Sequence, residues 1–269
     1  MISNVRALSR RMPPGLLPWV IPMGCLGLWL GASQTGMVPT YLLPHPMEVA
    51  NAGYYYVFGT PGTAPYAGRF AGDLSASLIR VGCGFLIAVL LGLPLGVLSG
   101  RLPAVQRLLG ASINGLRAVP GISWLPLAMV WFGIGTRTTL FLVALAAFFP
   151  IYLNAAAGAR QVDPLLLQAG AMLGVSRSRL VLSILLPASM SHILTGLRLG
   201  LGISWAYLVL GELSGVPNGL GAVIMDARMV GRIDLVVVGI ILIAAIGRLS
   251  DQLLKAFMRC CFKSVRRMA

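Results

Sequence analysis

The residues most able to do specific chemistry lie between two long apolar runs, in the segment from Gln161 to Ser191. Asp163 is a residue type that caps helix N-termini, and Pro164 suits the first helical position. The residues 165–173 can continue a helix, and Gly174 suits the left-handed position that ends one. The segment therefore predicts a capped helix of roughly ten residues, about 15 Å long at 1.5 Å per residue.

This short helix is too short to span a bilayer and too apolar to be explained as a helix in water. Ser176 can cap a second helix that carries Arg177 and Arg179 in its first turn. One interpretation is a helix that rests on the membrane surface. The other is a knob that docks in a groove on a partner protein. The residues alone leave both interpretations open.

Charged residues inside the apolar runs form a second group of candidates, because a charge in a membrane is costly and usually functional. Glu212 is either a helix end wetted by the outer solution or a gate or packing contact near a pathway. The arginines near the ends of the runs can reach the headgroups. Alternatively, they attract an anion to the pathway, since guanidinium matches sulfonate oxygens bidentately. These arginines are Arg80, Arg117, Arg198 and Arg248.

Aromatic and amide side chains in the same runs combine apolar bulk with few hydrogen-bonding groups, as a weak-affinity conduit requires. Packing and anchoring at the membrane surface are the alternative roles of such aromatics. The candidates of this kind are Trp124, Phe148, Phe149, Tyr152, Asn154 and Trp205. The predicted translocation pathway therefore comprises Arg80, Arg117, Trp124, Phe149, Tyr152, Asn154, Arg198, Trp205 and Glu212.

The composition indicates what positions these residues. Of 269 residues, 57% are hydrophobic and 10% are charged, whereas a soluble domain needs roughly 25% charged residues. Most of the surface therefore faces lipid. Stretches of about 20 apolar residues predict membrane-spanning helices, and the third of these is interrupted by Pro120 and Pro126. The six predicted spans are 16–34, 74–99, 112–133, 137–158, 192–213 and 233–254.

The distribution of Lys and Arg predicts the orientation of the chain. With a cytoplasmic N-terminus, the inner segments carry thirteen Lys and Arg residues and the outer segments carry four. Both termini are therefore expected in the cytoplasm. The net charge of +14 falls between the apolar blocks, which argues against a nucleic-acid-binding patch. The long outer loop 35–73 contains His45 between two prolines, where a turn is the expected role.

The spacing in the segment from Gln161 to Ser191 resembles the EAA loop of ABC-importer permeases. In that family the pattern is Glu-Ala-Ala, three residues, Gly, nine residues, Ile, one residue and Leu-Pro. Here Gln and Gly replace the usual Glu and the second Ala, and every spacing agrees. The matching residues are Gln168-Ala169-Gly170, Gly174, Ile184 and Leu186-Pro187.

The resemblance extends over about residues 39–254 and is strongest to the sulfonate, taurine and nitrate branch, with aliphatic-sulfonate permeases closest. The motifs that carry it are Leu43-Pro44-His45-Pro46, Ser77-Leu78-Ile79-Arg80, Arg117-Ala118-Val119-Pro120, Trp124-Leu125-Pro126-Leu127, Trp131-Phe132-Gly133-Ile134-Gly135, Phe149-Pro150-Ile151-Tyr152, Thr195-Gly196-Leu197-Arg198 and Gly219-Leu220-Gly221.

The resemblance implies an all-α membrane protein of the type I ABC importer fold, with six transmembrane helices and a short cytoplasmic coupling helix. It implies a homodimer in the bacterial inner membrane, two ATPase subunits that bind ATP and Mg, and a periplasmic or lipid-anchored substrate-binding protein. The chain itself would hold no cofactor and catalyse no reaction, and it contains no phosphate-binding G-x-x-x-x-G-K-[ST] loop. The implied coupling residues are Asp163, Pro164, Leu165, Gln168, Ala169, Gly170, Gly174 and Arg177.

The implied activity is ATP-driven import, by alternating access, of a small solute such as an aliphatic sulfonate, taurine or nitrate. Bicarbonate and a heterocyclic vitamin or precursor are the alternative substrates, and an ion-coupled secondary transporter is the alternative function. A membrane enzyme is disfavoured because His45 and His192 supply no catalytic constellation. The predicted organisation is a cytoplasmic segment 1–15, a first helix and periplasmic loop 16–73, a five-helix core 74–254 with the EAA-like loop 161–191, and a basic cytoplasmic tail 255–269.

Overall fold

The computed structural model describes residues 20–35 and 38–261, which form helices joined by turns and contain no strand. The predicted segment 1–15 and most of the predicted tail lie outside the described residues. The chain divides into two compact units. The first comprises Met1–Gly68 and Ala227–Val238, and the second comprises Arg69–Asp226 and Gly239–Ala269.

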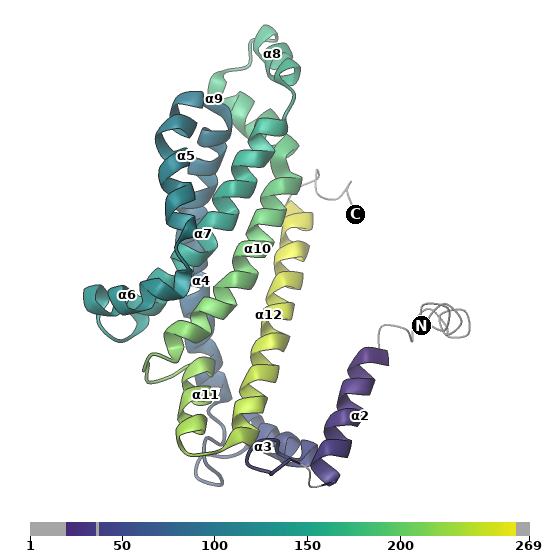
Figure 1. Cartoon of the computed structure of the whole chain (residues 1–269). Coiled ribbons are helices and arrows are strands. Elements are labelled where there is room, and N and C mark those ends of the chain that lie inside the picture. The colour runs from purple at the N-terminus through teal and green to yellow at the C-terminus, as the bar shows by residue number, and fades with distance from the viewer. Residues whose placement is uncertain (1–19, 36–37, 262–269) are drawn as a thin grey trace, which may run out of the picture. The chain divides into compact units, whose positions relative to one another are not determined.

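The second unit carries the candidate residues in a bundle of helices (Figure 1). Two further helices, α11 (Leu220–Met229) and α12 (Ile233–Cys261), have residues in both units. The elements of the bundle are α4 (Phe70–Arg101), α5 (Pro103–Ala118), a 3₁₀ turn η2 (Gly121–Ser123), α6 (Trp124–Phe132), α7 (Thr136–Gln161), α8 (Pro164–Met172), α9 (Arg177–Leu180), a π-helical turn η3 (Val181–Leu185) and α10 (Leu186–Glu212).

Among the described residues, four helices are long and apolar enough to cross a membrane. They confirm the predicted helices at 74–99, 137–158, 192–213 and 233–254, and all four extend beyond at least one predicted end. The helix α12 continues to Cys261, so the start of the predicted tail is helical. The described part of the first predicted span is α2 (Val20–Gln34), which has 15 residues. The count of six spans stays a prediction.

The predicted helix 112–133 is wrong as a single element. The helix α5 ends at Ala118, and the chain turns through Val119 and Pro120 before η2 and α6 begin. Proline has no N–H and disfavours a helical conformation at the preceding residue, and Val119 is extended with φ −73° and ψ 121°. After this break α6 lies across the bundle instead of along it (Figure 1).

The centre of the bundle is α7, which packs against α4 on one side and α10 on the other. Glycines on both neighbours face it, as expected where small residues let membrane helices approach closely. A Cβ atom at Gly96 of α4 would lie 2.5 Å from the Tyr152 carbonyl oxygen, and one at Gly196 of α10 would lie 2.7 Å from the Asn154 Cβ. The close approach of α4 and α10 to α7 therefore depends on these glycines.

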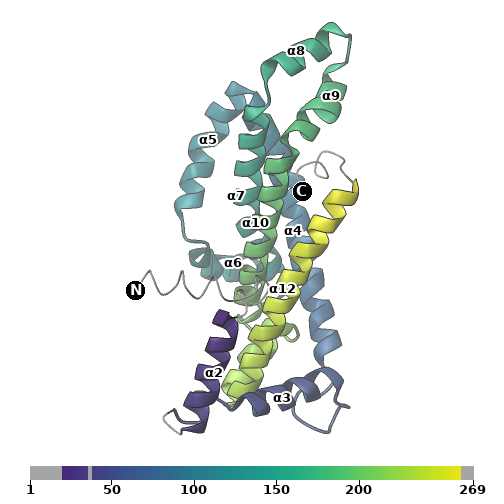
Figure 2. The same ribbon diagram turned by 90° about the vertical axis from the view of Figure 1, so that its right-hand side faces the viewer.

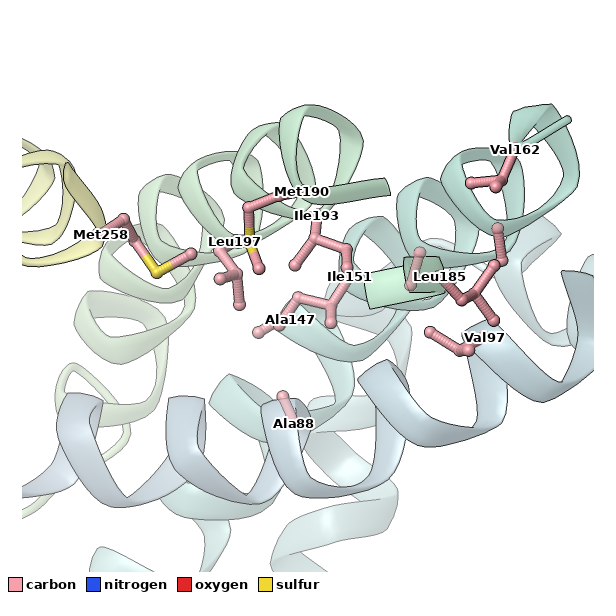
Figure 3. Packing of buried hydrophobic residues seen from close by; sticks show 12 residues of the cluster. Ala88, Val97, Ala147, Ile151, Val162, Leu185, Met190, Ile193, Leu197 and Met258 are labelled. Atoms are coloured by element: carbon pink, nitrogen blue, oxygen red, sulfur yellow. The ribbon is translucent and has the colours of Figure 1, made fainter. Parts of the chain in front are cut away.

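Aliphatic side chains fill the space that the glycines leave (Figure 3). Ala147 and Ile151 of α7 lie between Ala88 of α4 and Ile193 of α10 in this cluster. Leu185 of η3 lies near Val162, which precedes α8, and Met258 of α12 lies at the other side of the cluster in this view. The tight packing holds α7 in one position relative to its neighbours.

The π-helical turn η3 lies between α9 and α10 and ends two residues before Pro187. A proline inside a helix lacks an N–H and its ring clashes with the carbonyl four residues earlier. The widened turn accommodates this clash, so α9, η3 and α10 continue as one helical run from Arg177 to Glu212.

The first unit contains α2 and α3 (Pro46–Phe58), and α3 lies within the predicted outer loop 35–73. His45 is the N-cap of α3: its Nδ1 accepts from the Met47 amide, and the Glu48 carboxylate accepts from the His45 amide at 3.2 Å. The expectation that His45 is a turn element is confirmed by this capping box.

Candidate functional site

The short helix predicted from the EAA-like segment is α8, and both of its caps are present. The Leu165 amide donates to the Asp163 carboxylate at 2.8 Å, and Pro164 occupies the first turn. At the other end the Val175 amide donates to the Gly170 carbonyl at 3.1 Å, while Gly174 has φ +75°. This pairing across a left-handed glycine is a Schellman motif. The predicted caps are confirmed.

Three contacts fix α8 to the bundle. Arg101 at the end of α4 donates from Nη2 to the Val162 carbonyl at 2.9 Å, just before the helix begins. His192 of α10 hydrogen-bonds to the Gln161 side chain at 2.8 Å. Gly170 is buried, and a Cβ there would lie 2.6 Å from Leu180 Cδ2 and 2.7 Å from Ile184 Cδ1. These contacts connect α8 and the residues before it to α4, α9, η3 and α10.

The outer face of α8 is apolar and exposed. Leu165 is 67% exposed, Met172 86% and Leu173 83%. In both ribbon views α8 lies beyond the ends of α7 and α10 (Figures 1 and 2). Of the predicted coupling residues, Gly170 is buried and the following are exposed: Asp163, Pro164, Leu165, Gln168, Ala169, Gly174 and Arg177.

At the opposite end of the bundle, Arg80 and Glu212 form a buried ion pair. Arg80 is 5% exposed and Glu212 is 0% exposed. The Arg80 Nη1 donates to Glu212 Oε1 at 2.8 Å. The interpretation of Glu212 as a helix end wetted by solvent is wrong, and so is that of Arg80 as a residue reaching for headgroups. Both side chains are satisfied inside the protein, as a buried charge pair requires.

The same ion pair holds the turn between α10 and α11. The Glu212 carboxylate also accepts from the Ser77 hydroxyl and from the Gly221 amide, each at 2.8 Å. Arg80 donates to the carbonyl and side-chain oxygens of Asn218 at 2.7 and 2.5 Å. The Gly219 amide donates to Asp73 at 3.0 Å. Two helices and a turn therefore meet at one network of charge-assisted hydrogen bonds.

Arg198 and Trp205 connect α10 to α12. The Arg198 Nε donates to the Asp251 carboxylate at 2.7 Å, and Lys255 approaches the same carboxylate at 3.1 Å. The Trp205 indole N–H donates to the Ser250 hydroxyl at 2.9 Å. Both predicted pathway residues thus contact another helix.

Three other predicted pathway residues converge on one pocket. Arg117 at the end of α5, Trp124 at the start of α6 and Phe149 in the middle of α7 line a cavity of about 330 Å³. The fourth wall is α10, which contributes Ile203 and Tyr207. We call this cavity the Arg117 pocket.

A second cavity follows the first along α7 toward α8. It has a volume of about 520 Å³ and shares Leu153 with the Arg117 pocket. Tyr152 is at its edge, and the Tyr152 hydroxyl lies 2.7 Å from the Ser99 hydroxyl of α4. Asn154 donates to the Pro150 carbonyl of its own helix at 2.8 Å and packs against Gly196. The transport roles of all these residues stay predictions.

Several residues of the site were missed by sequence reasoning. Ser77 lies in the same motif as Arg80, and its position one helical turn earlier was a usable signal. Asp251 could have been found as an acid inside an apolar run. Tyr207 carries no local signal, because only the packing of α10 against the break after α5 brings it to the Arg117 pocket.

The chain is similar in sequence to known proteins over most of its length. Residues 92–259 match the family described as binding-protein-dependent transport system inner membrane component. The chain is 39% identical over 234 residues to the taurine transport system permease protein TauC of Escherichia coli (strain K12), covering 87% of this chain and 84% of that protein. It is 34% identical over 265 residues to SsuC of Bacillus subtilis (strain 168), a permease protein named for aliphatic sulfonate transport, with 97% and 93% covered.

Two other known proteins are similar to the chain at lower sequence identity. The nitrate import permease protein NrtB of Synechocystis sp. (strain PCC 6803) is 31% identical over 214 residues, covering 78% of this chain and 77% of that protein. The structure of the MetNI methionine ABC transporter in an inward-facing conformation superposes with a TM-score of 0.56 at 20% identity. It covers 70% of this chain and 95% of that chain, which shows a shared fold.

Proposed function

The chain belongs to the family of binding-protein-dependent transport system inner membrane components, and from this premise we propose that it is the membrane-spanning subunit of an ATP-driven importer of small anions. The family associates with ATPase and substrate-binding partners. We propose a second copy of the permease, two ATPase subunits that bind ATP and Mg, and a periplasmic or lipid-anchored binding protein. The excess of Lys and Arg on one side supports cytoplasmic termini.

The observation that carries the proposal is the exposed apolar face of α8. A capped helix with Leu165, Met172 and Leu173 exposed, outside the four long apolar helices, is suited to fill an apolar groove on a partner. Its contacts with α4, α9 and α10 give a physical route from that partner to the bundle. ATP-driven closure of the ATPase subunits would move α8 and thereby switch the accessible side of the bundle.

The two successive cavities beside α7 support a pathway on this face of the bundle. They extend from the Arg117 pocket, near the middle of α7, toward the end of α7 that adjoins α8. Arg117 and Arg160 line the first and the second cavity, respectively. Positive charge along a low-dielectric passage favours anions. The names of the relatives, for sulfonate, taurine and nitrate, agree with a solute that carries an anionic group.

The alternative of an ion-coupled transporter would need a carboxylate free to take up a proton or a cation. The acidic side chains found in the interior of the described part of the bundle already have partners. Asp73 accepts from the Gly219 amide at 3.0 Å and lies 3.8 Å from Arg69. Glu212 pairs with Arg80, and Asp251 pairs with Arg198 and Lys255. These pairs favour ATP as the energy source over ion coupling.

The proposal is tested with a matched pair of substitutions. Leu165 of α8 is 67% exposed, and Ile134, which precedes the opposite end of α7, is 65% exposed. Leu165→Asp places a charge in the proposed docking surface, whereas Ile134→Asp does so far from it. The tagged permease is expressed with its ATPase and binding protein, purified in mild detergent, and the bound ATPase is quantified.

We expect Leu165→Asp to lose most of the copurified ATPase and Ile134→Asp to retain it. Replacement of residues 164–173 by a Gly/Ser linker of equal length should abolish copurification. Undiminished ATPase in the linker variant would overturn the assignment of α8. A wild-type complex that hydrolyses ATP but moves no solute would overturn the importer function itself.

A further inference from the structure

We propose that the Arg117 pocket is a binding subsite for a small organic anion, in which Arg117 and Tyr207 hold the anionic group and Trp124 and Phe149 contact the apolar body. This inference rests on the proposed function and adds the substrate class and the residues that recognise it. An alkanesulfonate of two or three carbons is the chemistry that the pocket fits best.

Arg117 differs from the other three arginines proposed to attract an anion, of which Arg248 lies 3.9 Å from the Asp251 carboxylate. Arg80 is committed to Glu212, and Arg198 is committed to Asp251. Within the described part of the chain, Arg117 has neither a carboxylate nor a hydrogen-bond partner. Its five N–H donors are therefore available to a ligand.

The position of Arg117 along the membrane-spanning bundle indicates that its unpaired charge serves a ligand. The pocket is lined by Leu145, Phe149 and Leu153, which lie around the middle of α7 (Thr136–Gln161). A helix of this length measures about 39 Å at 1.5 Å per residue, so its middle lies near the centre of a bilayer. An unpaired cation at that depth is costly unless it faces a water-filled cavity or an anion.

The break after α5 explains how the cation comes to lie there. Pro120 ends α5 halfway along the bundle. Arg117 lies in the last turn of this helix and therefore lines the cavity. Gly121 follows at once, and a Cβ at this position would collide with the Tyr207 hydroxyl. The glycine thus lets Tyr207 approach the same break from α10.

Tyr207 supplies a second donor. Its hydroxyl has no hydrogen-bond partner among the described residues, although the ring is partly buried. A phenol beside a guanidinium can donate to an oxygen that the arginine does not reach. A planar guanidinium presents two parallel N–H donors, and two of the three sulfonate oxygens can accept from them. This match favours a bidentate contact.

The remaining walls select an organic anion. Trp124, Phe149 and Ile203 present apolar surface to a cavity of about 330 Å³, at the small end of ligand pockets, which range over about 300–1,000 Å³. A bare inorganic anion gains nothing from these walls, whereas an alkyl chain is removed from water by them. We therefore expect an alkanesulfonate to bind more tightly than nitrate.

The test measures binding directly, without ATP. The permease is assembled with its ATPase, without the binding protein that would itself bind the solute, in phosphatidylcholine nanodiscs, and tryptophan fluorescence is followed during titration with ethanesulfonate. Ethanesulfonamide, a neutral molecule of similar shape, is the probe for charge. The Trp124→Phe variant identifies the part of the signal that arises in the pocket.

We expect ethanesulfonate to bind the wild type at least tenfold more tightly than ethanesulfonamide, since a charge-assisted contact contributes about a factor of ten or more. Arg117→Gln should remove this preference, Arg117→Lys should restore part of it, and Tyr207→Phe should weaken binding several-fold. Arg107→Gln is the control, because Arg107 is an exposed arginine on the same helix outside the pocket.

Equal binding of the two probes by the wild type would overturn the proposal, and so would an unchanged preference in Arg117→Gln. A signal that persists in Trp124→Phe would place the ligand elsewhere. Loss of the response in nanodiscs containing phosphatidylglycerol would identify a lipid phosphate as the occupant and equally contradict it. These outcomes are separate from failure of the importer function, which would appear as ethanesulfonate binding without ATP-dependent uptake.

Discussion

Arg80 and Glu212 are 132 residues apart in the sequence, and their side chains meet at 2.8 Å inside the protein. The pair joins the beginning of α4 to the end of α10 and holds the turn that follows α10. Because both side chains are buried, each charge depends on the other. The end of the bundle opposite α8 is thus fixed by electrostatics, whereas the α8 end is fixed by caps and packing.

Removing one member of this pair should destabilise the protein strongly. Glu212→Gln leaves the buried Arg80 guanidinium without its counter-charge, and we expect a loss of about 3–5 kcal/mol. The double variant Arg80→Met, Glu212→Leu should be more stable than Glu212→Gln. Thermal unfolding in detergent measures both, with exposed Arg137→Gln as the neutral control. A melting temperature for Glu212→Gln equal to that of the wild type would contradict the burial of the pair.

Two glycines of α4 should respond in opposite ways to the same substitution. A Cβ at Gly96 would lie 2.5 Å from a backbone oxygen of α7, and one at Gly82 would meet nothing within 4 Å. Gly96→Ala should therefore separate α4 from α7 and lower the stability. Gly82→Ala should be neutral, or stabilising by up to about 1 kcal/mol, because alanine favours the helix. Equal melting temperatures of the two variants would contradict the close contact.

The left-handed end of α8 depends on Gly174. Alanine at φ +75° costs about 1–2 kcal/mol, whereas asparagine tolerates this conformation better. Gly174→Ala should speed hydrogen exchange of the Val175 amide, which donates to Gly170, by about tenfold for each 1.4 kcal/mol lost. Gly174→Asn should exchange more slowly than Gly174→Ala. The same exchange rate in both variants would show that the Schellman motif does not hold this end.

The replacement of the family's second alanine by Gly170 has a structural counterpart. Leu180 and Ile184 pack directly over this glycine, but the nearest atoms are the ends of flexible side chains. Gly170→Ala should therefore be tolerated, with a change within about 1 kcal/mol. Gly170→Leu should displace α8 and lower ATPase copurification. Full copurification with Gly170→Leu would contradict a fixed position of α8 on α9 and η3.

The structural features predicted most accurately from the sequence are those determined by residues that are neighbours in the chain. The residues Asp163, Pro164 and Gly174 specify α8 and its caps by their own conformational preferences, and long apolar runs specify the four long helices. Within 112–133, hydropathy alone indicated one span. The conformational restriction imposed by Pro120 on Val119 decided the outcome, and produced two helices instead of one.

Tertiary contacts explain what could not be predicted. Whether Glu212 faces solvent or protein depends on Arg80, and no spacing rule connects residues on two different helices. Likewise, nothing local distinguishes Arg117 from Arg198 until Asp251 of α12 is found to pair with the latter. Arg117 is distinguished from the other arginines only once the partners of those arginines are known.

We propose that α8 couples ATP hydrolysis to solute import through this subunit. This proposal is tested most directly by measuring ATP hydrolysis and uptake of ethanesulfonate in the same proteoliposomes, which contain the permease, its ATPase and its binding protein. We predict uptake that requires ATP in the wild type and in Ile134→Asp, and that is lost in Leu165→Asp. Uptake that continues without ATP, or at the wild-type rate in Leu165→Asp, would contradict the claim.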